Sequence, residues 1–113
     1  MKTEPLARTP KPPYYAVIFT SLRTNGDNGY SQMADRMFAL AREQPGYLGA
    51  ESVRNNDGVG ITVSYWSDLD SISAWKAHSD HQIAQAIGKK TWYQDYVLRV
   101  AKVEKEYTRN SDS

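Results

Sequence analysis

Residues 14–22 constrain the fold most, because this segment is apolar on both of its alternating faces. It reads Tyr-Tyr-Ala-Val-Ile-Phe-Thr-Ser-Leu and is dense in aromatic and β-branched side chains, which favour strands. Apolar residues on both sides of a strand indicate that the strand is buried on both sides. The protein must therefore cover two faces of the sheet that contains this strand.

The next three elements follow from periodicity and turn residues. Apolar side chains recur at spacings of three and four over residues 30–41, which predicts an amphipathic helix. A Pro-Gly pair at residues 45–46 ends it. Residues 47–54 and 60–66 are β-prone runs joined by a segment with an Asp-Gly pair. That arrangement predicts an antiparallel hairpin.

The last two elements are a second helix and a closing strand. Residues 67–88 have helical periodicity and begin with a capping-box pattern at 67–70. A second cap-like pair at 79–82 predicts that this helix breaks beside His78 and restarts. Residues 96–107 alternate in side-chain character and predict a long final strand.

The order of elements predicts an α+β protein with a ferredoxin-like βαββαβ arrangement, in which two helices cover one face of a four-stranded antiparallel sheet. The first strand is apolar on the second face too, so that face needs another cover, and a second copy of the chain provides it. We therefore expect a homodimer. The domain spans residues 14–107, between a flexible arm at 1–13, which holds four of the five prolines, and a flexible C-terminus at 108–113.

Composition excludes several classes of function. Fourteen Lys and Arg residues against thirteen Asp and Glu residues, interspersed along the chain, give a net charge of +1, so we expect no nucleic-acid partner. The absence of cysteine excludes thiol catalysis and thiolate metal sites. No signal peptide or long apolar run is present, so we expect no membrane association and a cytoplasmic location.

Several stretches resemble the antibiotic biosynthesis monooxygenase family. Residues 44–51, with the sequence Gln-Pro-Gly-Tyr-Leu-Gly-Ala-Glu, and residues 60–66, which end in Tyr-Trp, are similar to the family's second and third strands. Residues 75–81 and 92–96, with Arg99, resemble one bacterial subgroup whose members are mostly uncharacterised. The resemblance covers nearly the whole folded unit. It implies a dimeric α/β barrel with an antiparallel sheet.

The resemblance also implies two kinds of chemistry. Some members of the family oxidise quinol or anthrone-like substrates without metal or flavin, and others bind and degrade haem. Trp66 matches the pocket tryptophan of the first kind, but the asparagine four residues before it is Thr62 here. Trp75 matches the helical tryptophan of the haem-degrading kind, but the corresponding histidine position holds Gln85, and residues 14–22 contain no asparagine.

His78 and His81 are the two histidines, three residues apart on the second predicted helix. Imidazole titrates near neutral pH, so either side chain is a candidate catalytic base that accepts a phenolic proton. The structural alternative is that one histidine caps the predicted helix break while the other is solvated. No third ligand lies at a suitable spacing, so we expect no metal site.

Large rings and one arginine are the candidate substrate-binding residues. They are Trp66, Trp75, Trp92, Tyr65 and Arg99. The rings can stack on a planar ligand, or they can fill the core or the dimer interface. Arg99 lies between apolar neighbours on one face of the last strand, so we expect it to face an enclosed space and to pair with a carboxylate or a ligand oxyanion.

Three functions remain open at this point. The first is a monooxygenase that needs no cofactor and acts on a small aromatic, quinol-like substrate. The second is a non-catalytic module that binds a small molecule or takes part in a stress response. The third is a haem-binding or haem-degrading protein. Oxygen uptake with quinols supports the first, and a Soret band on adding haem supports the third.

Overall fold

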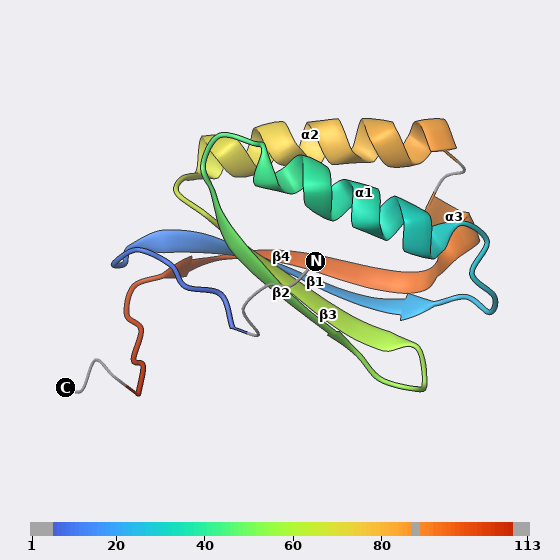
Figure 1. The fold of residues 1–113 in the computed structure, drawn as a ribbon, viewed down its shortest axis with the longest axis horizontal. Helices are drawn as coiled ribbons and strands as arrows, with labels where there is room; N and C mark the ends of the chain where they lie inside the picture. The colour runs from blue at the N-terminus through green and yellow to red at the C-terminus, as the bar shows by residue number, and fades with distance from the viewer. Residues whose placement is uncertain (1–5, 87–88, 110–113) are drawn as a thin grey trace.

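The order of helices and strands is the one the sequence predicts (Figure 1). The structure is a computed structural model that describes residues 6–86 and 89–109, with the side chains of residues 81–90 outside that description. Its elements are β1 (Tyr14–Arg23), α1 (Tyr30–Arg42), β2 (Tyr47–Arg54), β3 (Val59–Trp66), α2 (Leu69–Ala86), α3 (Lys89–Trp92) and β4 (Tyr93–Val103). The α+β, ferredoxin-like prediction is confirmed.

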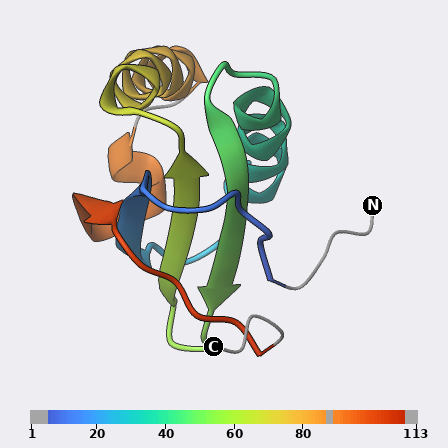
Figure 2. The ribbon, with the colours of Figure 1, turned by 90° about the vertical axis from the view of Figure 1, so that its left-hand side faces the viewer.

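The four strands form one antiparallel sheet in the order β2-β3-β1-β4. The apolar strand β1 is central, with Val17 opposite Ser64 of β3 on one side and Val100 of β4 on the other. Both long helices lie over the same face of the sheet (Figures 1 and 2). The sheet is open in the single chain, with β2 and β4 at its edges.

The core lies between this face and α2. Val17, Trp66 and Ile72 form its buried centre, and Trp66 is 0% exposed. Alternation along β1 then places Val17 and Phe19 toward the helices and Ala16 and Ile18 toward the opposite face. Burial of a tryptophan removes about 150–250 Å² of surface from water, so Trp66 anchors α2 to the sheet.

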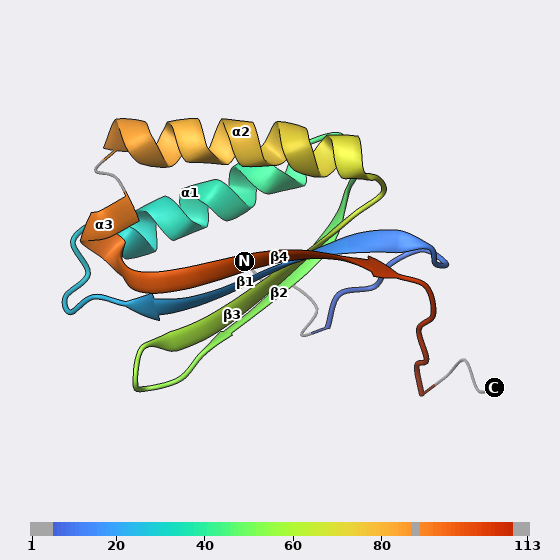
Figure 3. The same cartoon turned by 180° about the vertical axis from the view of Figure 1, so that it is seen from behind.

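The opposite face of the sheet, here called the open face, carries apolar side chains without a helix above them. Val53 is 75% exposed, Ile61 46% and Val97 43%. The described part of the N-terminal arm, residues 6–13, lies on this side of the sheet (Figure 3). The Ala7 amide donates a hydrogen bond to Glu51 Oε2 over 2.9 Å, so the arm is tied to β2 at this point.

Helix α2 differs from the prediction in two ways. It is continuous from Leu69 to Ala86, so the predicted break beside His78 is wrong. The hydroxyl of Ser79 donates to the Lys76 carbonyl within the same helix instead of capping a new one. The N-terminal cap is Asp68, whose carboxylate accepts a hydrogen bond of 2.7 Å from the Ser71 amide.

Strand β4 occupies Tyr93–Val103 and not residues 96–107 as predicted. The end of the ladder explains the difference, because Val103 pairs with Tyr14, the first residue of β1. Pro12 and Pro13 precede Tyr14 and have no backbone N–H to continue the pairing. Alternation therefore continues in the sequence beyond the point where a partner strand exists.

Gly46 lies in the turn between α1 and β2, and Gly29, just before α1, is its control. Gly46 has a φ of +86°, and a Cβ there would lie 2.1 Å from Ser71 Oγ, whereas Gly29 has a φ of +85° with no atom within 4 Å of such a Cβ. We expect Gly29→Ala to lower the free energy of unfolding by about 1 kcal/mol, the cost of left-handed backbone. Gly46→Ala adds a steric clash and costs about 3 kcal/mol or more. Urea denaturation measures both, and equal losses would contradict the close approach to Ser71.

Candidate functional site

A cavity of about 280 Å³ lies between the helices and the sheet. All four strands, the two long helices and α3 contribute residues to its lining. Its large side chains include Phe19, Tyr30, Met33, Trp75, Trp92 and Tyr93. The cavity is at the small end of ligand sites, which enclose about 300–1,000 Å³, so it suits a ligand of one or two rings.

Strand β3 adds two hydroxyls to a cavity floor that is otherwise apolar, with Val17, Phe19, Leu98 and Val100 on β1 and β4. Thr62 and Ser64 both line it. Thr62 Oγ1 lies 2.8 Å from Ser52 Oγ of the neighbouring strand, and Ser64 Oγ accepts a hydrogen bond of 2.9 Å from the Trp66 indole. Aromatic walls over a floor that carries two hydroxyls can hold a planar ring and bond to its oxygen substituents.

One end of the cavity is built from aromatic rings in edge-to-face contact. The Tyr93 ring lies 5.3 Å from that of Phe19 and 5.8 Å from that of Tyr30, with interplanar angles of 81° and 88°. Trp92 is 2% exposed, and its indole donates to the Asn28 carbonyl over 3.0 Å. These contacts fix the rings before any ligand arrives. Tyr30 and Tyr93 line the cavity although they were absent from the predicted site.

The predicted tryptophans have two different positions. Trp75 and Trp92 line the cavity. Trp66 lies beneath it, fully buried, and its ring stacks on Trp75 with centroids 6.1 Å apart and an interplanar angle of 25°. Trp66 therefore supports Trp75 from the core and does not itself form the wall.

Tyr65 and Arg99 lie on the open face, away from the cavity. Tyr65 donates a hydrogen bond of 2.8 Å to Glu51 Oε1. Arg99 stands opposite Ile18 in the ladder and is exposed, because the alternation that turns its neighbours Leu98 and Val100 into the cavity turns Arg99 outward. The expectation that Arg99 faces an enclosed space is therefore not met within one chain.

The two histidines do not line the cavity as far as the described side chains extend. His78 is half-buried on α2, with its ring centroid 5.7 Å from that of Trp75. Its Nε2 is shielded from solvent and has no hydrogen-bond partner in the described part of the chain. The side chain of His81 lies outside the described residues. Two residues after His78, Asp80 does line the cavity and pairs with Lys76 over 2.8 Å.

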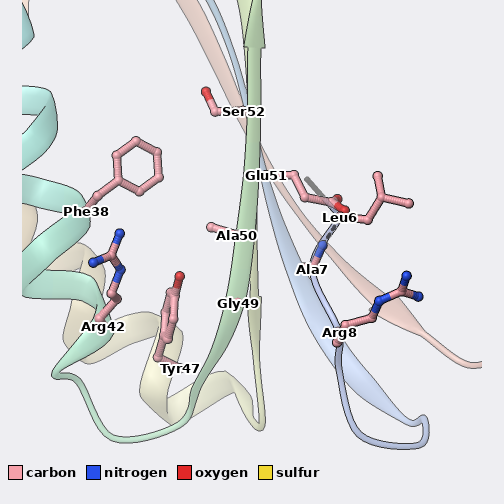
Figure 4. A pocket seen from close by; sticks show the side chains of 10 residues that line it. All are labelled: Leu6, Ala7, Arg8, Phe38, Arg42, Tyr47, Gly49, Ala50, Glu51 and Ser52. Carbon is pink, nitrogen blue, oxygen red and sulfur yellow. Dashed lines mark hydrogen bonds between the residues drawn. The ribbon is translucent and has the colours of Figure 1, made fainter. Parts of the chain in front are cut away.

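A second hollow, of about 640 Å³, straddles the free edge of β2 (Figure 4). Phe38, Arg42 and Tyr47 border it on the helix side, and the arm residues Leu6 and Arg8 border it on the other. Because β2 runs through the middle of this hollow, no part of it can surround a ligand. The smaller cavity under the helices is therefore the better candidate site.

The described residues contain neither a metal-binding cluster nor a membrane-spanning helix. No group of three or more His, Cys, Asp or Glu side chains in residues 6–86 and 89–109 could hold a metal ion. Within the same residues, no helix is both long and apolar enough to span a bilayer.

The described residues form an α+β fold with an aromatic cavity between the helices and the sheet, and comparison with known proteins gives the family of the chain. Residues 15–87 match the family model described as antibiotic biosynthesis monooxygenase. The chain belongs to this family, which confirms the resemblance seen in its sequence. The protein YqjZ of Bacillus subtilis (strain 168), described as uncharacterised, is 54% identical over 101 residues, covering 89% of each chain.

Solved structures share the fold at low sequence identity. SnoaB from Streptomyces nogalater, described as a cofactor-independent oxygenase, superposes with a TM-score of 0.64 at 13% identity, covering 88% of this chain and 99% of SnoaB. Protein SO0527 from Shewanella oneidensis superposes with a TM-score of 0.68 at 8% identity, covering 85% and 95%. At these identities the similarity establishes the fold alone.

Buried tyrosines make stability sensitive to alkali. Burial raises the pKa of Tyr93, and burial with the nearby Glu51 carboxylate raises the pKa of Tyr65. Unfolded tyrosine releases its proton near about pH 10, so above that pH the unfolded chain binds fewer protons than the folded one and the free energy of unfolding falls as pH rises. We expect Tyr93→Phe to make this fall shallower in urea titrations at a series of pH values. Tyr107→Phe, which removes an 81% exposed phenol, is the matched control, and an equal change in both variants would contradict the assignment.

Proposed function

We propose that this chain is a cofactor-independent monooxygenase that acts on a small aromatic, quinol-like substrate bound in the cavity. The carrying observation is the combination of aromatic walls with two hydroxyls on the floor in a space of about 280 Å³. Membership of the antibiotic biosynthesis monooxygenase family supports the reaction type. The shared fold with SnoaB, a cofactor-independent oxygenase, is consistent with it.

The proposed reaction needs only the substrate and oxygen. Loss of a phenolic proton makes the ring electron-rich, and the anion then reduces O₂ directly. When a ring methylene becomes a carbonyl, the substrate supplies four electrons, so one oxygen atom enters the product and the other leaves as water. The enzyme's contribution is to hold the ring in place, exclude water and accept the proton. Trp75 and Trp92 hold the ring in this scheme.

The proton acceptor has two candidates on α2. His78 is one of the two bases predicted from the sequence, and its shielded Nε2 has no hydrogen-bond partner in the described residues. It does not line the cavity, because its ring lies beside Trp75, which does. Asp80 lines the cavity directly and is held by Lys76. His81 remains a prediction from the sequence.

Haem binding is less well supported by the residues that line the cavity. Haem iron is held by an axial side chain such as histidine, cysteine, methionine or tyrosine. No described lining residue is a histidine, and Tyr30, Tyr93 and Tyr96 of the wall are in contact with other rings. A non-catalytic binding module would use the same cavity and differ only in having no turnover.

Oxygen uptake with isotopically heavy O₂ tests the proposal. With an anthrone or naphthoquinol substrate, we expect uptake above the enzyme-free rate and one heavy oxygen atom in the product by mass spectrometry. Removing the wall ring in Trp75→Ala should lower kcat/KM by about tenfold or more, because stacking is worth about 1–3 kcal/mol.

The base is assigned by two further variants. Asp80→Asn and His78→Gln each remove one candidate acceptor while keeping a side chain of similar size. The true acceptor should lose about a hundredfold or more in kcat, the contribution of general base catalysis. Binding without uptake would leave the non-catalytic module, and a Soret band with added haem would favour the haem-binding alternative.

We also propose that two chains associate through the open face. The face presents Val53, Ile61 and Val97, each at least 43% exposed, and exposed apolar surface of this extent is typical of an interface. We expect sedimentation to give twice the chain mass of 12.8 kDa. Ile61→Asp should shift the protein toward monomer, whereas Leu69→Asp, at an exposed apolar residue of α2, should not. A monomeric wild-type protein would contradict the proposal.

A further inference from the structure

Two arginines contact one tyrosine at the end of the cavity. The guanidinium carbon of Arg23 lies 3.7 Å from the centroid of the Tyr30 ring, and that of Arg54 lies 5.7 Å from it. Tyr30 itself lines the cavity. Two positive charges therefore stand directly behind one wall of the candidate site, where cations over a ring are favourable.

The position of Arg54 depends on the absence of a side chain at Gly60. The two residues are opposite each other in the β2–β3 ladder. A Cβ on Gly60 would lie 2.5 Å from Arg54 Cζ and 2.7 Å from its Nη2, so any other residue would displace the guanidinium. Gly60 does not have a positive φ. The glycine is needed here for space, which lets Arg54 lie flat across the sheet beneath Tyr30.

Arg54 uses this position to donate hydrogen bonds to hydroxyls. Its Nη2 donates to Ser21 Oγ over 3.0 Å and to the Tyr30 hydroxyl over 3.2 Å, and its Nη1 donates to the Gly58 carbonyl over 2.6 Å. Because the Tyr30 oxygen accepts from a cation, its own proton is free to be donated. Hydrogen-bonded groups in series polarise one another, so Arg54 strengthens Tyr30 as a donor.

Tyr93 supplies a second donor to Tyr30. Burial raises the pKa of Tyr93, and so does its hydrogen bond with Tyr30, so the Tyr93 hydroxyl donates to the Tyr30 oxygen. Both tyrosines line the cavity, and their ring centroids lie 5.8 Å apart. The Tyr30 oxygen thus accepts from a guanidinium and from a phenol, and its own proton is left for a bound molecule.

No carboxylate among the described residues forms a salt bridge with either arginine. Arg23 donates to the carbonyls of Thr24, Gly26 and Asp27, and its Nε is buried without a partner in that part of the chain. The nearby carboxylate of Asp27 accepts hydrogen bonds from the amides of Gly29 and Ser31. The Arg23 guanidinium also helps to lower the pKa of the Asp27 carboxyl. Arg54 is exposed, and its hydrogen bonds go to the neutral oxygens of Ser21, Tyr30 and Gly58, so its positive charge can act on an anion held near Tyr30.

We propose that this end of the cavity is a subsite for the oxyanion of an aromatic ligand, either a carboxylate or an ionised hydroxyl. Tyr30 donates to the oxyanion, and Arg54 and Tyr93 act as positioning residues through Tyr30. The inference rests on the proposed function, since it concerns the same cavity, and it narrows the substrate class to acidic aromatic compounds. It assigns to Tyr30 the contact with an oxyanion that the sequence indicates for Arg99.

Binding of a matched pair of probes tests the subsite without requiring turnover. Naphthoate and naphthamide have the same ring and nearly the same shape, and only naphthoate carries a charge. Quenching of tryptophan fluorescence gives the dissociation constant of each. We expect wild-type protein to bind naphthoate about tenfold or more tightly than naphthamide, as hydrogen bonds to a charged group allow.

Three variants and one control show whether the preference comes from these residues. Arg54→Gln should reduce the ratio of the two affinities about tenfold, and Arg54→Lys should recover part of it because the charge is kept. Tyr93→Phe should lower naphthoate affinity about fivefold and leave naphthamide unchanged. Arg36→Gln is the matched control, because it removes the same charge from an exposed position on α1 and should leave the ratio unchanged.

Each outcome decides the proposal. Equal binding of both probes to wild-type protein overturns the oxyanion subsite and leaves the aromatic cavity of the proposed function intact. Failure of both probes to bind overturns the subsite and the proposed function together. A ratio that survives in both Arg54→Gln and Tyr93→Phe also overturns it. If Arg54→Gln does not fold, as judged by circular dichroism, Tyr93→Phe alone decides, because it removes a single hydroxyl and none of the bonds made by Arg54.

Discussion

The central strand β1 has to bury both of its faces, and the remaining architecture follows from that requirement. On one face Val17 packs with Trp66 and Ile72, so α2 is fixed over the sheet. On the other face Tyr14 and Ala16 are 5% and 4% exposed, while Val53 of β2 and Ile61 of β3 are left uncovered. A single chain thus satisfies the strand at its centre but leaves the flanks of the sheet in contact with water.

Most of the fold was predictable because its signals are local. Alternation, spacings of three and four, and turn residues are properties of a few neighbouring positions. The predicted end of β4 and the predicted break in α2 were wrong because contacts beyond the local sequence pattern determine where each element ends. The ladder ends at Val103 because its partner strand begins at Tyr14, and the cap-like pattern after His78 has no effect because the helix continues with its own backbone hydrogen bonds.

The site was less predictable than the fold. Alternation indicates that Val97, Arg99 and Ala101 share a face, but it does not say which face meets the helices, and the apolar neighbours of Arg99 belong to the open one. Tyr30 and Tyr93 are 63 positions apart in the sequence and meet only through the folded sheet. The role of Gly60 likewise requires the register that places it opposite Arg54.

Strand β3 shows how the chain divides its two faces. Toward the helices, Gly60, Thr62 and Ser64 are small or polar, and only the last residue of the strand, Trp66, is a large buried ring. Toward the open face the strand presents Ile61, Val63 and Tyr65, which are large. Over residues 60–65 this is the reverse of a strand that only stabilises the chain, which would place large apolar residues under the helices.

This reversed pattern has two consequences at once. Small residues on the covered face leave the cavity unfilled and give Arg54 room to lie beneath Tyr30. Large apolar residues on the open face favour the association that we propose between two chains. Residues 60–64 of β3 therefore lose packing within the chain at the candidate site, and burial between chains can offset that loss. In this arrangement the stability of the sheet would depend on the second copy, whereas the cavity would stay open for a ligand.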